Sequence, residues 1–400
     1  MAEIPRYLSL LAVDRCEWVR YVVPGRRGTS PERRKVEIMT RGARRETANG
    51  RRSPAPPATS PLEETLQGHA AGRDGMRRWQ RRIRENVYTQ NGDFIHTLRY
   101  HLGDGFDAIH EDLARFGADV PTTLEDLVAE NDFRLNNPRV EQYDGIGDRR
   151  DHIVHHAAYD RAGDIIYGTD IVRRLVRPGG LVEGHAFYFL SAHAGDTGHN
   201  CPVMCNFETA RLLRGLADFP DRDRLVAGLE TPSYMGNITA SQFLTEVQGG
   251  SDVGANATLA WKHDDGSWRI RGEKWFCSNA NADVQIISAR YNTEQTGSRG
   301  LAMFLVPARM PDGSWNAFTF RRLKEKIGTR ALASAEIDYH DAHAIPLGPL
   351  QSGFKTLLAE VIHHSRLALA TGVLGMASRG YQLARAYADE RHAFGSPIIE

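Results

Sequence analysis

The segment over residues 242–253 combines a pair of glycines with hydroxyl side chains, which suits it to hold a ligand. It reads QFLTEVQGGSDV. Gly249 and Gly250 let backbone N–H groups reach a bound molecule, and Thr245 and Ser251 supply hydroxyl groups. The same Gly-Gly-Ser-Asp pattern is common in plain turns, so this segment alone does not establish a site.

A second segment, residues 272–278, places aromatic rings beside a hydroxyl group on a strand that leaves a predicted hairpin. It reads GEKWFCS. The aromatic cluster suits stacking on a planar ring, and Ser278 suits a hydrogen bond to the edge of that ring. Ordinary strand packing accounts for the same residues equally well.

Two arginines delimit a long helical segment near the C-terminus. Arg366 precedes that segment, and Arg391 follows it in the run ERHAFG. An arginine at a helix end beside a glycine suits a phosphate contact, although helix capping is its commoner use. No metal site is predicted, because the adjacent His155 and His156 point to different faces of a helix.

These segments need a β-domain and helices to position them. Residues 237–345 hold short runs of β-branched and aromatic residues between Asp-Gly turns, which predicts an antiparallel β-domain. Residues 90–236 and 346–400 are helical in periodicity instead. The expected fold is therefore multidomain α+β, with a helical N-terminal domain, a central β-domain and the start of a C-terminal helical bundle.

Individual helices can be placed by their apolar spacing. They are predicted over residues 106–116, 124–130, 157–177, 184–194 and 208–216, and over a long stretch whose apolar residues from 370 to 388 share one face. Gly372, Gly375 and Gly380 on that stretch would allow close approach of another helix or of a cofactor.

Residues 1–89 form a separate lead-in segment. The first 75 residues are rich in Arg, Pro, Gly and Ser without a sustained period, so they are predicted to be disordered. A basic nucleic-acid tail, an organelle-targeting segment and sequence upstream of the mature protein, with Met76 as its start, all remain open. Acidic residues such as Glu32 and Glu46 argue against a transit peptide.

Composition and charge narrow the class of protein. The 50 basic residues balance the 50 acidic ones, so net charge attracts neither nucleic acid nor an anionic membrane. The sequence predicts neither a membrane span nor a secretory signal, and no membrane partner is expected. Four cysteines in 400 residues favour a reducing compartment, and we expect a cytoplasmic protein.

Taken in order, four stretches of the chain resemble the acyl-CoA dehydrogenase family. They are TEVQGGSDV, GEKWFCSNANAD, KIGTRALASAEIDYHDAHAIPLG and RLALATGVLGMASRGYQLARAYADERHAFG, which together run from Thr245 to Gly395. The last stretch aligns without gaps. We call residues 242–253 the ligand loop. The alkylation-response AidB-type branch of the family shows the strongest resemblance, which lies in the ligand loop, the DGS hairpin, the PDG turn and the run over 322–330.

The resemblance implies an FAD-dependent flavoprotein with a central β-barrel and a homotetrameric assembly. It implies that the flavin ring is held by the residues that match the family's two binding segments, namely Gln242, Phe243, Leu244, Thr245, Gly249, Gly250, Ser251, Phe276, Cys277 and Ser278. Thr245 and Ser278 would bond the ring through their hydroxyls. Arg391 would reach the FAD pyrophosphate of a neighbouring subunit, and Ser251 and Arg366 would contact an acyl-CoA substrate.

The implied reaction removes the α-proton of an acyl-CoA thioester and transfers the β-hydride to flavin. Hydrogen bonds to the thioester carbonyl would stabilise the developing enolate, typically by about 3 kcal/mol per donor. The base is a carboxylate whose pKa is raised by burial. The acyl chain length and the electron acceptor are not readable from the sequence.

The catalytic residue is the point at which this sequence departs from the family pattern. The family's usual glutamate lies late in the C-terminal bundle, beyond Glu400, and the chain is expected to be a fragment of a longer protein. Some members place the base just before the residue matching Arg366. That position is Ser365 here, after His363 and His364, so no substitute carboxylate is expected.

Two alternative functions remain open at this point. An AidB-like flavoprotein would act mainly by binding DNA in alkylation stress, and the Arg-rich N-terminus is the only support for that within this chain. An acyl-CoA oxidase would share the fold but let oxygen reach the reduced flavin.

Overall fold

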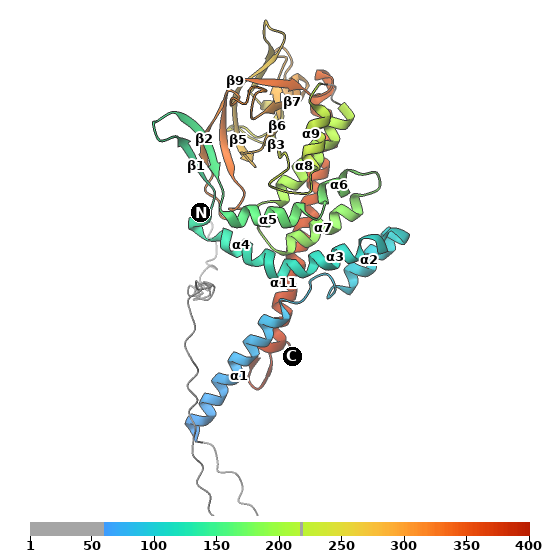
Figure 1. Ribbon diagram of the computed structural model, residues 1–400, viewed down its shortest axis with the longest axis vertical. Helices are drawn as coiled ribbons and strands as arrows, with labels where there is room; N and C mark the ends of the chain where they lie inside the picture. Colours follow the sequence, from blue (N-terminus) through green and yellow to red (C-terminus); the bar gives the residue numbers. More distant parts are fainter. Residues whose placement is uncertain (1–59, 217–218) are drawn as a thin grey trace, which may run out of the picture. The chain divides into compact units, whose positions relative to one another are not determined.

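The computed structural model describes residues 60–216 and 219–400 of the chain. Within these residues a helical region is followed by a β-barrel and then by a long helix, which confirms the predicted α+β order (Figure 1). The disorder predicted for residues 1–59 lies outside the described residues.

The described α-helices α1 to α9 precede the barrel, and α10 and α11 follow it. These are α1 Pro61–Arg82, α2 Gly92–Leu102, α3 Asp107–Asp119, α4 Glu125–Asp132, α5 Ala157–Tyr167, α6 Ile171–Val176, α7 Leu181–His193, α8 Asn200–Leu216, α9 Arg222–Leu229, α10 Gly353–Thr356 and α11 His363–Glu390. The single helix predicted over 157–177 is wrong: the chain forms α5 and α6 instead. Asp170 at the junction takes a left-handed conformation with φ 61°, which a continuous helix does not allow.

Residues 61–75 were expected to be disordered, and the structure corrects this prediction because they form the first part of α1. Ser60 and Glu63 build a capping box, in which the Ser60 N–H donates to the Glu63 carboxylate at 2.8 Å. The helix then packs on α11, where Trp79 meets Tyr387 edge to face at 5.9 Å. The partner lies some 300 residues further along the chain, so local composition gave no sign of it.

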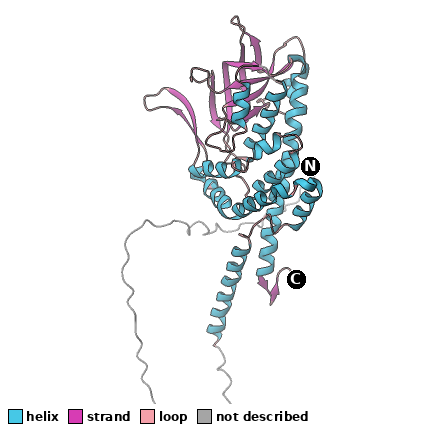
Figure 2. Cartoon of the chain, turned by 45° about the vertical axis from the view of Figure 1, so that its right-hand side comes forward, coloured by secondary structure: helices cyan, strands magenta, loops and turns pink. Residues whose placement is uncertain are grey.

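The barrel is one seven-stranded sheet (Figure 2). Its strands are β3 Ala240–Phe243, β4 Leu259–Lys262, β5 Trp268–Ser278, β6 Val284–Arg290, β7 Leu301–Pro307, β8 Phe318–Leu323 and β9 Ser334–Pro346. The order β3-β6-β4-β5-β9-β7 closes on itself because β7 also pairs with β6, and β8 adds to β9. The antiparallel prediction is therefore confirmed for most of the strand pairs in the barrel.

Two pairings contradict the purely antiparallel prediction, since β6 runs parallel to β3 and to β4. Strand β3 arrives from helix α9 rather than from a hairpin turn, and such a connection does not force an antiparallel neighbour. A small hairpin outside the barrel was also missed. It consists of β1 Arg139–Tyr143 and β2 Arg149–Val154, within the region predicted to be helical. A second short pair, β10 His392–Ala393 and β11 Ser396–Pro397, follows α11.

A separate apolar core joins the helices to the barrel. Leu212 and Leu213 of α8 pack with Ala240 of β3 and Ile286 of β6, all of them essentially inaccessible to solvent. This packing holds α8 against the strand that leads into the ligand loop. The relative placement of these two elements is therefore set by burial of apolar side chains.

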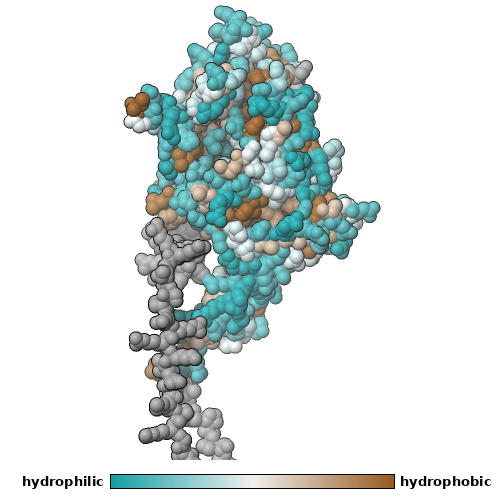
Figure 3. Space-filling model, in the orientation of Figure 1, coloured by the Kyte–Doolittle hydropathy of each residue, from teal (hydrophilic) through white to brown (hydrophobic). Residues whose placement is uncertain are grey.

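Helix α11 packs on the rest of the protein through the face opposite to the apolar face predicted from its sequence. Val373, Leu374 and Tyr381 are more than half exposed, whereas the buried residues of the helix are His364, Ala368, Gly372, Gly375, Arg379 and Ala386. The described helices include none long and apolar enough to cross a membrane. The side of the molecule drawn in Figure 3 is largely hydrophilic, with hydrophobic groups in small patches.

The glycines of α11 differ in what surrounds them. A Cβ added at Gly375 would lie 2.5 Å from the carbonyl oxygen of Phe189 in α7, and one at Gly372 would lie 3.3 Å from the ring of Tyr188. These two glycines therefore allow the close approach predicted for them. Nothing among the described residues lies within 4 Å of a Cβ at Gly380, so the close approach expected there stays a prediction.

Replacing Gly375 with alanine should therefore push α11 away from α7 and lower the free energy of unfolding by about 1–3 kcal/mol. The matched control is Gly380→Ala, which meets no neighbour and should raise stability by about 0.5–1 kcal/mol because alanine favours helix. Urea denaturation followed by circular dichroism measures both. Equal effects of the two substitutions would contradict the close packing at Gly375.

Candidate functional site

The two predicted binding segments lie side by side in the structure. Gln242 and Phe243 end strand β3, and the loop that follows runs against the end of β5. The backbone N–H of Trp275 donates to the carbonyl oxygen of Thr245 at 2.9 Å. The fold therefore joins the hydroxyl-bearing loop to the strand that carries Phe276 and Ser278.

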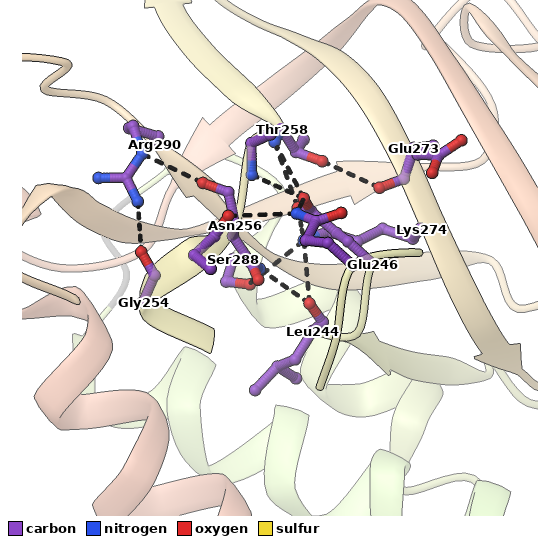
Figure 4. A network of polar contacts seen from close by, with 12 residues as sticks. Leu244, Glu246, Gly254, Asn256, Thr258, Glu273, Lys274, Ser288 and Arg290 are labelled. Carbon is purple, nitrogen blue, oxygen red and sulfur yellow. Dashed lines mark hydrogen bonds and ion pairs between the residues drawn. The ribbon is translucent and has the colours of Figure 1, made fainter. Parts of the chain in front are cut away.

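The ligand loop is anchored by the buried carboxylate of Glu246 (Figure 4). Its oxygens accept hydrogen bonds from the backbone N–H of Ala257 at 2.6 Å and from the Gln248 amide at 2.7 Å. The ammonium of Lys274, which is fully buried on β5, lies 2.8 Å away. One carboxylate thus ties the loop, the segment that leads into β4 and strand β5 together.

The same network fixes the residue on the other side of Thr245. The carbonyl oxygen of Leu244 accepts from the Asn256 amide at 2.8 Å and from the Lys274 ammonium at 3.2 Å (Figure 4). Asn256 is held in turn by Ser288 of β6, at 2.9 Å. The backbone is therefore bonded at Leu244, at Thr245 and at Glu246, which leaves the Thr245 hydroxyl in a set position.

The charge on Glu246 depends on its partners. Burial opposes ionisation, but Lys274 and the donated hydrogen bonds outweigh burial and hold the pKa of Glu246 below its usual value. Glu246 is therefore ionised at neutral pH. A charge so deep in the barrel is stable only while its partners remain in place.

The glycine pair has a specific structural role. A Cβ at Gly250 would lie 2.6 Å from the Thr245 hydroxyl oxygen, so any other residue would displace that hydroxyl. Gly249 has φ 154° and exchanges backbone hydrogen bonds with Glu246 in a tight turn. These contacts argue for more than a plain turn.

Strand alternation separates the predicted binding residues into two groups. Phe276 is 56% exposed and Ser278 is half-buried, whereas Cys277 between them is completely buried in the barrel core. Phe243 is buried in the same core. Cys277 and Phe243 can therefore reach a ligand only through their backbones, while Ser251 is exposed at the far end of the loop.

The polar atoms at this site fit a planar ring with a polar edge. The Gln242 amide nitrogen is buried without a hydrogen-bond partner near the end of β3, on the opposite face of the strand from Phe243. A large aromatic side chain, Phe276, stands exposed beside the Ser278 hydroxyl. Buried donors without partners are uncommon in folded proteins, and a polar group bound at this position would complete the hydrogen bonding of Gln242.

The structure adds one residue that the sequence analysis missed, the buried Glu208 of α8. Its carboxyl accepts a hydrogen bond from the Ser365 hydroxyl at 2.7 Å, and its second oxygen has no partner. Burial raises the pKa of Glu208 to about 8, although the hydrogen bond from Ser365 and the nearby Gln242 amide act to lower it. The position before Arg366 therefore carries no carboxylate of its own, and the Glu208 carboxyl lies within hydrogen-bonding distance of the Ser365 side chain.

A sequence signal for Glu208 existed but was not distinctive. Glu208 lies one helical turn before Leu212 and one after Cys205, both buried, so it occupies the apolar face of α8. An acidic residue on such a face is a candidate for a perturbed pKa. What the sequence did not show is that this face meets Ser365.

The two predicted phosphate or substrate contacts do not converge within one chain. Arg366 is exposed in the first turn of α11, and Arg391 is exposed at the helix's C-terminal cap. The 25 residue-to-residue steps from Arg366 to Arg391 span about 37 Å at the rise of an α-helix. Within the described residues, no group of three or more His, Cys, Asp or Glu side chains is arranged to hold a metal ion.

Comparison with protein families identifies two matching regions. Residues 241–342 match the acyl-CoA dehydrogenase middle domain, and residues 351–400 match the acyl-CoA dehydrogenase C-terminal domain. The first region covers the barrel strands and the ligand loop. The second begins before α11 and covers all of it.

Two relatives align over most of the chain. AidB from Escherichia coli strain K12 is 32% identical over 328 residues, which is 79% of this chain and 58% of AidB. Acyl-CoA dehydrogenase family member 11 from Caenorhabditis elegans is 29% identical over 78% of this chain and 52% of its own length. The chain therefore spans little more than half the length of these relatives.

Solved structures agree with the sequence comparison. The crystal structure of Caenorhabditis elegans ACDH-11 in complex with C11-CoA has a TM-score of 0.73 at 26% identity, covering 79% of this chain and 55% of that one. Butyryl-CoA dehydrogenase from Megasphaera elsdenii, at 20% identity, has a TM-score of 0.51 over 77% of this chain and 72% of its own, which is a likeness of fold alone.

The substitution Lys274→Met should lower the free energy of unfolding by about 3–5 kcal/mol, because it leaves Glu246 as a buried charge without its partner. Adding Glu246→Gln to this variant removes that charge and should recover part of the loss. The control Lys262→Met, on the exposed side of β4, should change stability by less than about 0.5 kcal/mol. A loss below about 1 kcal/mol for Lys274→Met in urea denaturation would be incompatible with the ion pair as the anchor of the loop.

Glu208 should make stability fall as pH rises. Its folded pKa is above the unfolded value, so the stabilisation is complete below the unfolded pKa and is lost as pH rises through about 8. Between pH 6 and pH 9 the native chain should lose about 2–3 kcal/mol relative to Glu208→Gln, which carries no titrating proton. Denaturation midpoints of both proteins at the two pH values measure this, and parallel pH profiles would show that Glu208 is not protonated in the fold.

Proposed function

Because this chain belongs to the acyl-CoA dehydrogenase family, we propose that it forms the flavin-binding part of an FAD-dependent acyl-CoA dehydrogenase. The observation that carries the proposal is the anchored Thr245 hydroxyl. Hydrogen bonds hold the backbone at Leu244 and Thr245 and the side chain of Glu246, and Gly250 leaves room for the Thr245 hydroxyl. The hydroxyl lies on the loop that is joined to the strand bearing Phe276 and Ser278.

In this function the chain's own residues hold and orient the cofactor. Thr245 and Ser278 donate hydrogen bonds to the polar edge of the flavin ring, and Phe276 covers its outer face. The backbone of Gly249 and Gly250 approaches the ring, as does that of Cys277. Bound FAD supplies the hydride acceptor that protein side chains lack.

The proposed substrate is an acyl-CoA thioester, in line with the acyl-CoA complex of the C. elegans relative. Ser251 and Arg366 are its proposed contacts in this chain, and Arg391 is the proposed contact to the FAD pyrophosphate of a second subunit in a homotetramer. Glu208 is protonated at neutral pH, so it offers this region a neutral hydrogen-bonding acid rather than a ready base. We place the enzyme in the cytoplasm.

The test is a flavin titration of the purified protein. We expect a yellow complex with FAD that bleaches anaerobically when acyl-CoA is added. Gly250→Ala and Thr245→Ala should each weaken FAD binding by about tenfold, the effect of losing one well-placed hydrogen bond. Gly145→Ala, at an open turn where nothing lies within 4 Å of the added Cβ, should bind FAD like the native chain.

Two results would change the proposal. A folded protein that stays colourless in excess FAD would refute it. Peroxide release in air after acyl-CoA addition would reassign the enzyme from a dehydrogenase to an oxidase.

A further inference from the structure

The Ser278 hydroxyl at the end of β5 is connected to a lysine through one buried serine. Its oxygen lies 3.0 Å from the hydroxyl oxygen of Ser334, the first residue of β9, which is 3% exposed. The Lys326 ammonium donates to the same Ser334 oxygen at 2.8 Å. A second bond, to the carbonyl oxygen of Leu332 at 2.6 Å, holds the ammonium in place. Lys326, Ser334 and Ser278 thus form one continuous hydrogen-bonded chain.

The chemistry of the three groups determines which one donates and which one accepts in each hydrogen bond. An ammonium group only donates hydrogen bonds, so Ser334 must accept from Lys326. The bond draws electron density from the Ser334 oxygen and makes its own O–H a stronger donor toward Ser278. Ser278 then accepts from Ser334, and its own proton is free to point at a ligand.

We propose that Lys326 is a positioning residue for the cofactor: through Ser334 it fixes the Ser278 hydroxyl as a donor to the flavin ring and favours the reduced, more electron-rich state of that ring. The proposal rests on the flavin site proposed above. It assigns a role to two residues, Lys326 and Ser334, that lie outside the predicted binding segments.

The surroundings of Lys326 strengthen its effect. The ammonium is half-buried, and burial lowers the pKa of Lys326 while the nearby Asp196 opposes that shift. A partly desolvated charge is screened less by water and salt than an exposed one. Lys326 and Ser334 also line a pocket of about 430 Å³, so these hydrogen-bonded side chains border an accessible space.

Lys324 provides a natural comparison two residues earlier. It carries the same charge and lines the same pocket, and its ammonium lies 3.4 Å from the ring centroid of Trp275. However, that ammonium is bonded to the buried carboxylate of Glu336 at 2.6 Å. It therefore has a different hydrogen-bond partner from Lys326, a carboxylate that it shares with Arg322 at 2.8 Å, and its ammonium is not bonded to the Ser334 hydroxyl.

The experiment measures the midpoint potential of the bound flavin together with the dissociation constant of FAD. Lys326→Met and Ser334→Ala should each lower the potential by about 30 mV, which is a tenfold loss of preference for the reduced ring in a two-electron couple. Ser334→Thr keeps the hydroxyl and should retain the native potential. Lys324→Met should shift it by less than a third as much.

A double-mutant cycle decides whether the effect runs through Ser278. In a Ser278→Ala background, Lys326→Met should cause no further shift. An equal shift in both backgrounds would mean that the Lys326 charge acts through space. It would overturn the proposed relay, in which Lys326 acts on the flavin through Ser334 and Ser278. An unchanged potential in Ser334→Ala would overturn it as well.

Failure of the relay and failure of the flavin site are distinguishable. A native chain that binds no FAD overturns both proposals. A chain that binds FAD, but whose potential is insensitive to Lys326 and Ser334, overturns the relay alone. Circular dichroism and urea denaturation of each variant separate a change in potential from loss of the fold, and Ser334→Thr, which keeps the hydroxyl and adds one methyl group, provides the conservative comparison.

Discussion

The ligand loop depends on the buried ion pair between Glu246 and Lys274. The Glu246 carboxylate satisfies the backbone N–H groups of Ala257 and Thr258, which lie ahead of β4 and outside the sheet ladder. An apolar pair of the same volume would leave these donors buried without partners, which is costly. The pair is therefore best understood as the device that selects one loop conformation, in addition to any net stability it contributes.

That constraint determines which parts of the binding motif can act through side chains. With Thr245 bonded to Trp275, the register of loop against strand is fixed. The pairing of β5 with β9 shifts register between Lys274 and Cys277, after which Cys277 points into the barrel while Phe276 and Ser278 stay outside. Gly250 completes the arrangement because it leaves room for the Thr245 hydroxyl. The motif is thus a set of side chains and backbone groups with separate tasks.

The sequence predicted what is encoded locally. The helical–β–helical order, the barrel strands and the close contacts at Gly372 and Gly375 follow from periodicity and turn residues near each position. The errors concern contacts between distant residues. Helix α1 is polar and docks on Tyr387, strand β3 pairs in parallel with β6 after a long connection, and Glu208 meets Ser365 across 157 positions. No local pattern contains the partner in these cases, so composition alone misjudged the N-terminal residues, the strand direction and the carboxyl group beside α11.

Two buried glutamates near the loop show how environment alone divides one residue type into two roles. Glu246 faces an ammonium and several N–H donors, so it stays ionised and fixes the backbone. Glu208 faces a serine hydroxyl and an amide with no cation in hydrogen-bonding contact, so burial dominates and it keeps its proton. The neutral form leaves the space between α8, β3 and α11 without net charge from this residue. An ionised Glu208 there would oppose electron transfer onto a nearby ring, whereas the ionised Glu246 is compensated by Lys274 and has little field beyond its network. Lys274 lies beside Glu246 and not beside Glu208, and this position separates the protonation states of the two glutamates.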